Sequence, residues 1–177
     1  MRKTGANRVI VITGEGKGKT TAALGLVLRA VGHGLGVCVL HFIKNRRDTG
    51  EARALAGLPG VEAHQCGRGF VRERSGPVFE AHARAAHAGL RLAAAKLRDP
   101  AFGMVVLDEI CGAVALGLLP VEAVCAAVAG AAPGTIIVLT GRDAAPELVE
   151  LADTVSGITC VRHGLEAGWP AQAGVEF

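Results

Sequence analysis

The residues most able to do chemistry lie in one glycine-rich stretch, GEGKGKTT, which runs from Gly14 to Thr21. Glycines let the backbone bend so that several N–H groups converge on phosphate oxygens. Lys19 adds positive charge, and the hydroxyl of Thr20 can bind a divalent cation. Thr13 stands where the general phosphate-loop pattern G-x-x-x-x-G-K-[ST] has its first glycine, so the match is not literal. The stretch predicts a phosphate-binding site, with a purely structural turn as the alternative.

Two adjacent carboxylates form a second candidate feature. Asp108 and Glu109 directly follow the apolar run Val105–Leu107. A phosphate site that uses Mg²⁺ takes a carboxylate from the end of a neighbouring strand. The pair could instead only cap the next helix. The phosphate loop favours the metal interpretation, because it independently requires a partner for a cation near Thr20.

The elements that must position these residues alternate between short apolar runs and longer helical stretches. We expect strands at residues 8–13, 37–43, 61–65, 104–107, 135–140 and near 159–162, and helices at 20–31, 77–98, 120–130 and 146–152. Such alternation is typical of right-handed crossovers and a mostly parallel sheet with helices on both faces. The sequence therefore predicts one α/β domain over residues 1–177, with a short N-terminal arm at 1–7 and a mobile loop at 44–59.

Composition excludes several classes of protein. The chain has 177 residues, half of them apolar, which suffices for the core of one domain. Its apolar runs fall short of the roughly 18–20 residues that a membrane-spanning helix needs. A net charge of +3 and only 3% aromatic residues argue against a nucleic-acid surface. We therefore expect a soluble cytoplasmic protein that binds neither membrane nor nucleic acid.

The cysteines and histidines show no spacing that predicts a metal site or a catalytic triad. The five cysteines are odd in number and never two residues apart, so reduced, mostly buried thiols are the expectation. The six histidines are scattered, although His33 and His41 flank the strand expected at 37–43. An enzyme built from these residues would supply binding and charge rather than an acid–base pair.

Several stretches in order resemble the CobA/CobO/BtuR-type ATP:corrinoid adenosyltransferases, from about Arg8 to the C-terminus. They include the family's own form of the phosphate loop, with its first glycine shifted in the same way. The others are the stretches at residues 29–34, 42–44, 50–51, 105–109, 140–142, 151–156 and 161–177. The resemblance implies a RecA-like P-loop fold and a homodimer.

The resemblance also implies a reaction, in which the 5′-deoxyadenosyl group of ATP passes to the Co(I) centre of a corrinoid and triphosphate is released. The corrinoid would be cobalamin, cobinamide or cobyrinic acid a,c-diamide, in adenosylcobalamin biosynthesis or salvage. Co(I) is itself the nucleophile, so no protein base is needed. In the family the nucleotide lies reversed in the loop, which presents C5′ to the corrinoid, and a flavodoxin-like reductase is the implied electron donor.

Carried over by position, the resemblance assigns roles to individual residues. The ATP-binding residues are Gly14, Glu15, Gly16, Lys17, Gly18, Lys19, Thr20, Thr21, Arg29 and Arg142. Lys19 and Glu109 are the catalytic residues, and Thr20, Glu109 and Asp108 are the ligands of Mg²⁺ or Mn²⁺. Corrinoid-binding residues are Phe70, Arg72 and His41, with Arg72 standing where relatives carry tryptophan.

Two other functions stay open on the residues alone. One is a P-loop ATPase or kinase-like enzyme, which would release ADP rather than triphosphate. The other is a non-catalytic paralogue that binds a nucleotide or a corrinoid as a carrier or regulator. For Arg29 and Arg142, a surface salt bridge is the competing interpretation.

Overall fold

The structure is a computed structural model and describes residues 5–45 and 49–176. Within these ranges the strands are β1 (Arg8–Thr13), β2 (Val37–His41), β3 (Val61–Gln65), β4 (Met104–Asp108), β5 (Ile136–Thr140) and β6 (Thr154–Gly157). The α-helices are α1 (Lys19–Gly32), α2 (Gly50–Ala56), α3 (Gly76–Arg98), α4 (Ile110–Ala115), α5 (Val121–Ala129) and α6 (Pro146–Leu151). A short 3₁₀ helix, Gly164–Ala167, lies in the C-terminal segment.

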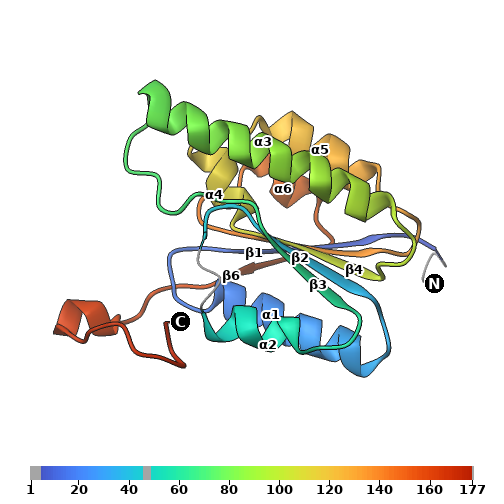
Figure 1. Cartoon of the computed structure of the whole chain (residues 1–177), viewed down its shortest axis with the longest axis horizontal. Coiled ribbons are helices and arrows are strands. Elements are labelled where there is room, and N and C mark those ends of the chain that lie inside the picture. Colours follow the sequence, from blue (N-terminus) through green and yellow to red (C-terminus); the bar gives the residue numbers. More distant parts are fainter. Residues whose placement is uncertain (1–4, 46–48, 177) are drawn as a thin grey trace.

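The strands form one sheet in the order β3-β2-β4-β5-β1-β6, and every neighbouring pair is parallel. Helices α1 and α2 cover one face, while α3, α4, α5 and α6 cover the other (Figure 1). The expected α/β fold of P-loop type, with a parallel sheet and helices on both faces, is confirmed. Because the strands are parallel, their carboxyl ends share one edge of the sheet, where ligands bind in such folds.

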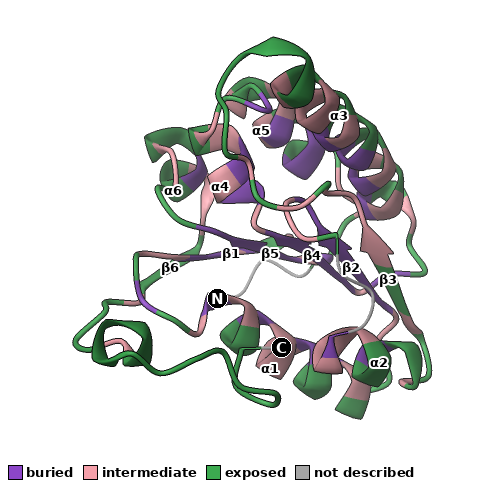
Figure 2. Cartoon of the chain, turned by 60° about the vertical axis from the view of Figure 1, so that its left-hand side comes forward, coloured by how far each residue is buried: buried purple, intermediate pink, exposed green. Residues whose placement is uncertain are grey.

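Alternate residues of the central strands enter two hydrophobic layers. Val105 and Leu107 of β4 point to the face of the sheet that α3 to α6 cover, whereas Val106 points to the opposite face, which α1 and α2 cover. All five residues of β2 and of β4 are buried. Figure 2 shows this buried sheet between two half-exposed helical layers. The strands read as continuous apolar runs because both faces are covered.

The last strand differs from the expectation at residues 159–162. Strand β6 instead occupies Thr154–Gly157 and pairs with β1, with Ile10 opposite Thr154. Asp153 fixes this register from both sides: its amide donates to the carbonyl of Val9, and its carboxylate accepts from the amide of Val9. The expectation was wrong because β6 is a short, exposed edge strand. Its sequence lacks the run of apolar residues from which buried strands are predicted.

The segment at 44–59 is not a simple loop. Helix α2 begins after Thr49, whose hydroxyl accepts a hydrogen bond from the amide of Ala52, and it buries Leu55 under the sheet. Residues 46–48 of the expected mobile loop, and residues 1–4 of the expected arm, lie outside the described ranges. Helix α4, also absent from the expectation, follows the carboxylate pair directly.

The longest described helix, α3, has 23 residues and carries several charges. Across residues 5–45 and 49–176, no helix combines the length and the apolar character that crossing a bilayer requires.

Candidate active site

The glycine-rich stretch forms a loop between β1 and the first turn of α1, as predicted. The ammonium group of Lys19 is buried and donates to the carbonyl oxygens of Gly14 (2.7 Å) and Gly16 (2.8 Å). Burial lowers the pKa of Lys19, against the opposing charge of nearby Glu109. The lysine thus donates to its own loop, and its charge lies where phosphate oxygens would be bound.

The chain that follows β6 forms the floor of this loop. The amide of Gly16 donates to the carbonyl of Ile158 (2.8 Å), and the amide of Ile158 donates to the carbonyl of Thr13 (2.8 Å). Gly14 has a φ of 101°, and a Cβ atom there would lie 2.5 Å from the carbonyl oxygen of Ile158. A Cβ at Gly16 would lie 2.6 Å from the carbonyl oxygen of Thr159. Glycine is therefore required at both positions by close backbone contact.

Asp108 is the centre of a buried hydrogen-bond network at the end of β4. Its Oδ1 accepts from the hydroxyls of Thr20 and Thr140, both at 2.8 Å. Its Oδ2 pairs with Nδ1 of His41 at 2.8 Å and with the ammonium of Lys44 at 3.4 Å. Burial opposes ionisation, but these donors and the charge of Lys44 hold the pKa of Asp108 well below its usual range.

Glu109 differs from its neighbour in environment and direction. Its backbone is left-handed, with φ 62°, and its amide donates to the hydroxyl of Thr140 (2.9 Å). Burial, followed by the adjacent charge of Asp108, raises the pKa of Glu109. The side chain lines the cavity, whereas Asp108, 1% exposed, does not. A residue in a strained left-handed conformation that faces a cavity is typical of a functional site.

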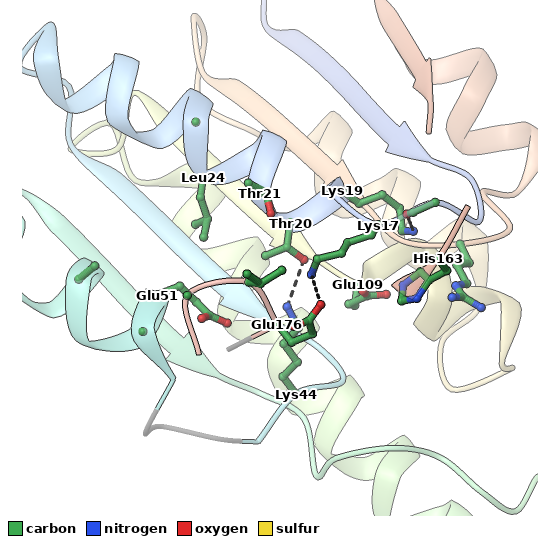
Figure 3. A pocket seen from close by; sticks show the side chains of 18 of the residues that line it. Lys17, Lys19, Thr20, Thr21, Leu24, Lys44, Glu51, Glu109, His163 and Glu176 are labelled. Carbon is green, nitrogen blue, oxygen red and sulfur yellow. Dashed lines mark hydrogen bonds and ion pairs between the residues drawn. The ribbon is translucent and has the colours of Figure 1, made fainter. Parts of the chain in front are cut away.

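A cavity of about 720 Å³ opens beside the loop (Figure 3). The phosphate loop, α1, α2 and the C-terminal segment all contribute to its wall. The carboxyl ends of β2, β4 and β5 add Lys44, Glu109 and Arg142. The cavity therefore brings together the loop, the Thr20 hydroxyl, the Glu109 carboxylate and four cations: Lys17, Lys19, Lys44 and Arg142.

The two arginines assigned to the nucleotide lie in different places. Arg142 lines the cavity and forms an ion pair with Glu15 (3.0 Å), and both side chains are about 60% exposed. Arg29 is exposed in the last turn of α1, ten residues beyond Lys19, and is not part of the cavity wall. At 1.5 Å per residue, that places it about 15 Å along the helix.

A second cavity of about 330 Å³ adjoins the first, and Lys44, Glu51 and Glu176 line both. Phe70, 89% exposed, lies in its wall, as a corrinoid-facing residue would. Arg72 is exposed and lines neither cavity.

His41 does not match its expected role. Its side chain is 1% exposed and bonded to Asp108, so it offers no surface to a corrinoid. Its position is instead that of a residue that orients Asp108 from inside the fold. The spacing placed His41 at the end of the strand, but it gave no information about the direction of the ring.

The sequence analysis assigned no site role to three charged residues of the cavity wall: Lys44, Glu51 and Glu176. Each lies in a stretch that resembles the family (residues 42–44, 50–51 and 161–177), but in no chemical motif that the residues themselves define. Lys44 could have been found, because it follows β2 as Glu109 follows β4, and these strands are neighbours. Glu176 reaches the site through the C-terminal segment and pairs with Lys17 at 3.7 Å (Figure 3).

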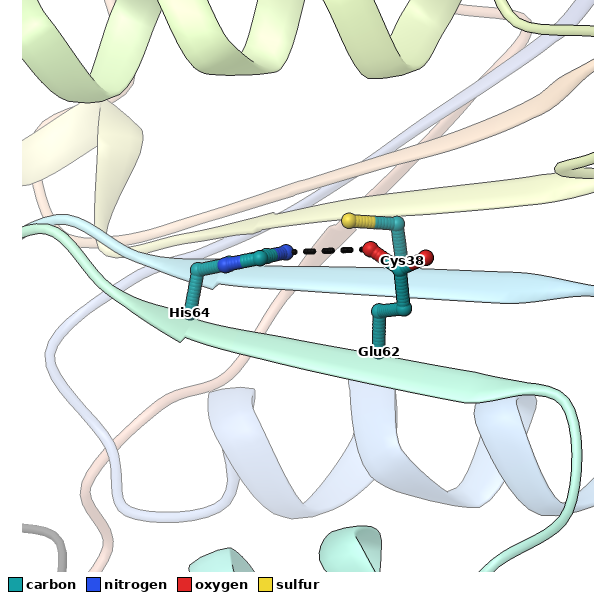
Figure 4. Close-up of side chains that lie close together, drawn as sticks. All are labelled: Cys38, Glu62 and His64. Atoms are coloured by element: carbon teal, nitrogen blue, oxygen red, sulfur yellow. Dashed lines mark hydrogen bonds and ion pairs between the residues drawn. The ribbon is translucent and has the colours of Figure 1, made fainter.

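A separate cluster lies on β2 and β3, under α3. Ligand atoms of Cys38, Glu62 and His64 lie within 4.8 Å of one another (Figure 4). They come together because Cys38 pairs with Glu62 across the sheet and His64 follows on the same face. The ammonium of Lys96 already donates to Glu62 at 2.5 Å, and burial raises the pKa of the Cys38 thiol to about 12. A cation of the protein itself therefore already pairs with the one carboxylate of this cluster.

A parallel sheet with a phosphate loop after β1, a lysine and threonine at the start of α1 and carboxylates after β4 defines a P-loop nucleotide-binding protein. The family model for the ATP:corrinoid adenosyltransferases BtuR/CobO/CobP matches residues 6–177. The chain belongs to this family, which is a family of transferases that use ATP and a corrinoid.

Named relatives agree with this assignment. The chain is 43% identical over 170 residues to the corrinoid adenosyltransferase CobA of Salmonella typhimurium, covering 96% of this chain and 85% of the relative. It is 40% identical to the corrinoid adenosyltransferase of Pseudomonas aeruginosa, with 96% and 83% covered. The corresponding enzyme of Escherichia coli K12 is 40% identical over 169 residues. The resemblance seen in the sequence motifs is thereby confirmed.

Proposed function

We propose that this chain transfers the 5′-deoxyadenosyl group of ATP to the Co(I) centre of a corrinoid and releases triphosphate, in adenosylcobalamin biosynthesis or salvage. The observation that carries the proposal is the pair of adjoining cavities. One contains the phosphate loop, and the other contains the exposed ring of Phe70. Their common wall gives two bound substrates a place to meet.

The phosphate loop binds the polyphosphate chain. The amides of residues 14–21 and the ammonium of Lys19 neutralise its charge, together with Lys17 from the loop and Arg142 from the end of β5. The reaction moves no proton, because the electron pair of Co(I) forms the bond to C5′ while the C5′–O pair leaves with triphosphate. Stabilisation of that departing charge is the main task of the protein.

The residues beside the loop fit a divalent cation such as Mg²⁺ or Mn²⁺. Oxygen donors are what these cations prefer, and Thr20 and Glu109 both present them to the cavity. When bound, the cation would shield the charge of the triphosphate. Both oxygens of Asp108 are already occupied by hydrogen-bond donors, so Asp108 acts by holding the Thr20 hydroxyl in place.

The corrinoid lies against the second cavity. Phe70 offers an apolar face at its mouth, and Arg72 lies in the same exposed loop, where it can contact the corrinoid periphery. His41 supports this site only indirectly, through Asp108. Arg29 is too far along α1 to contact the phosphates bound by the same subunit.

An anaerobic assay with chemically reduced cob(I)alamin or cob(I)inamide, ATP and Mg²⁺ tests the proposal. The expected result is a light-sensitive adenosyl-corrinoid formed in equal amount to triphosphate. Release of ADP without a Co–C bond would instead identify a P-loop ATPase or kinase. Binding of ATP with no turnover would identify a non-catalytic carrier. Lys19→Met, which removes the buried loop cation, serves as the inactive control.

We further propose that the protein acts in the cytoplasm as a homodimer and receives electrons from a flavodoxin-like reductase. The family resemblance supports the dimer and the reductase. Exposed apolar side chains, among them Leu165 and Trp169 of the C-terminal segment, supply surface that an interface could bury. Light scattering on the purified protein tests the dimer, and cob(II)alamin with reduced flavodoxin in place of a chemical reductant tests the electron donor.

A further inference from the structure

Lys44 occupies a position that no loop motif predicts. It follows β2, and its ammonium lies 3.1 Å from the Thr20 hydroxyl and 3.4 Å from the carboxylate of Asp108. These are the hydroxyl proposed to bind the cation and the carboxylate that orients it. Lys44 thus places a positive charge beside Thr20.

A divalent cation bound at Thr20 and Glu109 would displace this ammonium. Two positive charges cannot share the Thr20 oxygen, because like charges at this separation repel strongly in a partly buried site. The side chain of Lys44 is 36% exposed, and four rotatable bonds let its end move. A polyphosphate chain bound in the same cavity would then lie within reach of this side chain.

The location of Lys44 determines which part of the nucleotide it can reach. It lines both cavities, whereas Lys17, Lys19 and Arg142 line only the phosphate cavity. Glu51 and Glu176, which also line both, are anions and cannot stabilise a departing phosphate. Among the residues lining both cavities in the described ranges, Lys44 is therefore the one cation where they join.

We propose that Lys44 is a catalytic residue that stabilises the charge developing on the triphosphate oxygen as it leaves C5′. The inference rests on the proposed adenosyl transfer. In that step the electron pair of Co(I) forms the Co–C5′ bond, and the C5′–O pair remains on the oxygen. Cobalt is oxidised from Co(I) to Co(III), and the ammonium of Lys44 keeps its proton throughout. Its interaction strengthens as the oxygen gains charge, so it lowers the barrier rather than only binding ATP.

The test compares Lys44→Met, which keeps the length and removes the charge, with Lys44→Arg, which keeps the charge. Single-turnover rates are measured with excess cob(I)alamin and saturating ATP, and thermal unfolding checks that each variant folds. Lys44→Met should lower the rate by about 100-fold, the loss typical of removing one donor to a developing oxyanion. Lys44→Arg should react at least about tenfold faster than Lys44→Met. Lys96→Met, which removes the lysine paired with Glu62 under α3, is the matched control and should leave the rate unchanged.

A binding measurement tests the same claim without turnover. Inorganic triphosphate carries the charge of the leaving group, whereas ATP does not yet carry it. Calorimetry should show that Lys44→Met weakens triphosphate binding by about tenfold more than ATP binding, a ratio that Lys96→Met leaves unchanged.

Two results would overturn the inference about Lys44. One is a single-turnover rate of Lys44→Met within threefold of the parent. The other is an equal loss of ATP and triphosphate affinity with no further loss of rate, which would mean uniform binding. Neither result bears on the proposed function, because that function is tested with the parent protein. It stands if the parent forms adenosyl-corrinoid and fails if the parent forms none.

Discussion

Replacing Asp108 by asparagine removes one charge from the most densely bonded side chain of the site. The remaining carbonyl oxygen can still accept from the hydroxyls of Thr20 and Thr140, which now face Oδ1 at 2.8 Å. The new amide group would face His41 and Lys44, whose hydrogen bonds lose their charged acceptor. Hydrogen bonds to a charged group contribute about 1.5–3 kcal/mol each. Because the Lys44 contact is long and partly exposed, we expect Asp108→Asn to lower the free energy of unfolding by roughly 3 kcal/mol at pH 7.

The pH dependence of this loss follows from the direction of the pKa shift. Asp108 has a pKa below its ordinary value of 3.8 in the folded protein, because its donors favour the ionised form. Its contribution to stability is therefore complete above the unfolded pKa and is lost as the pH falls toward the folded pKa. The difference between parent and variant should be constant from pH 6 to 8 and should shrink below about pH 4.5.

Urea unfolding followed by circular dichroism across this pH range measures the difference directly. Asp143→Asn is the matched control, because Asp143 is an exposed carboxylate and no large change is expected there. A difference below about 0.5 kcal/mol at pH 7 would refute the network as a source of stability. If the difference in the free energy of unfolding between parent and Asp108→Asn did not change with pH, the charge of Asp108 would not be its cause. The difference would then come from the changed packing and hydrogen bonds of the side chain.

Other predictions concern the loop and the cysteines. Lys19→Met should weaken ATP binding by at least about 100-fold in calorimetry while the far-UV spectrum stays unchanged, because a buried phosphate-binding cation is lost. Gly16→Ala should lower both the melting temperature and the ATP affinity, since its Cβ would lie 2.6 Å from a backbone oxygen after β6; Gly32→Ala, with open space around it, should leave ATP affinity unchanged. Iodoacetamide should label the exposed Cys160 in the native protein, while Cys38, fully buried with a pKa of about 12, should be labelled only after unfolding, as mass spectrometry of the digested protein can show.

The bounds of several elements followed closely from the sequence, although the fully buried β2 ends at His41, two residues before the predicted end. β1 and β3 have the predicted bounds, and β4 extends the predicted run by one residue, Asp108. Helix α3 begins one residue before the predicted Pro77, whose fixed φ suits the first turn. The pattern was weakest at the β6 edge of the sheet, where the strand is short and exposed, and in the 44–59 segment, where α2 has only seven residues.

The site was predictable where one contiguous motif defines it. Eight consecutive residues identified the phosphate loop, and the apolar strand before Asp108 identified the carboxylates. The direction of a side chain was not predictable: Asp108 turns into the fold and Glu109 into the cavity, although they are neighbours in one sequence motif. That division accompanies the left-handed backbone of Glu109, which follows β4, and the hydrogen bond from its amide to the hydroxyl of Thr140 at the end of β5.

The position of β6 matters for function because it determines what lies beneath the phosphate loop. With the strand at Thr154–Gly157, the next residue, Ile158, bonds to both Thr13 and Gly16 and closes the loop from below. If the strand lay at residues 159–162 instead, Ile158 would come directly before it, and the amide of Gly16 would lose its hydrogen bond to the carbonyl of Ile158. The same register sends the remaining chain across the cavity, where Glu176 meets Lys17. The C-terminal segment is therefore part of the nucleotide site, and a change there that alters β6 should alter phosphate binding as well.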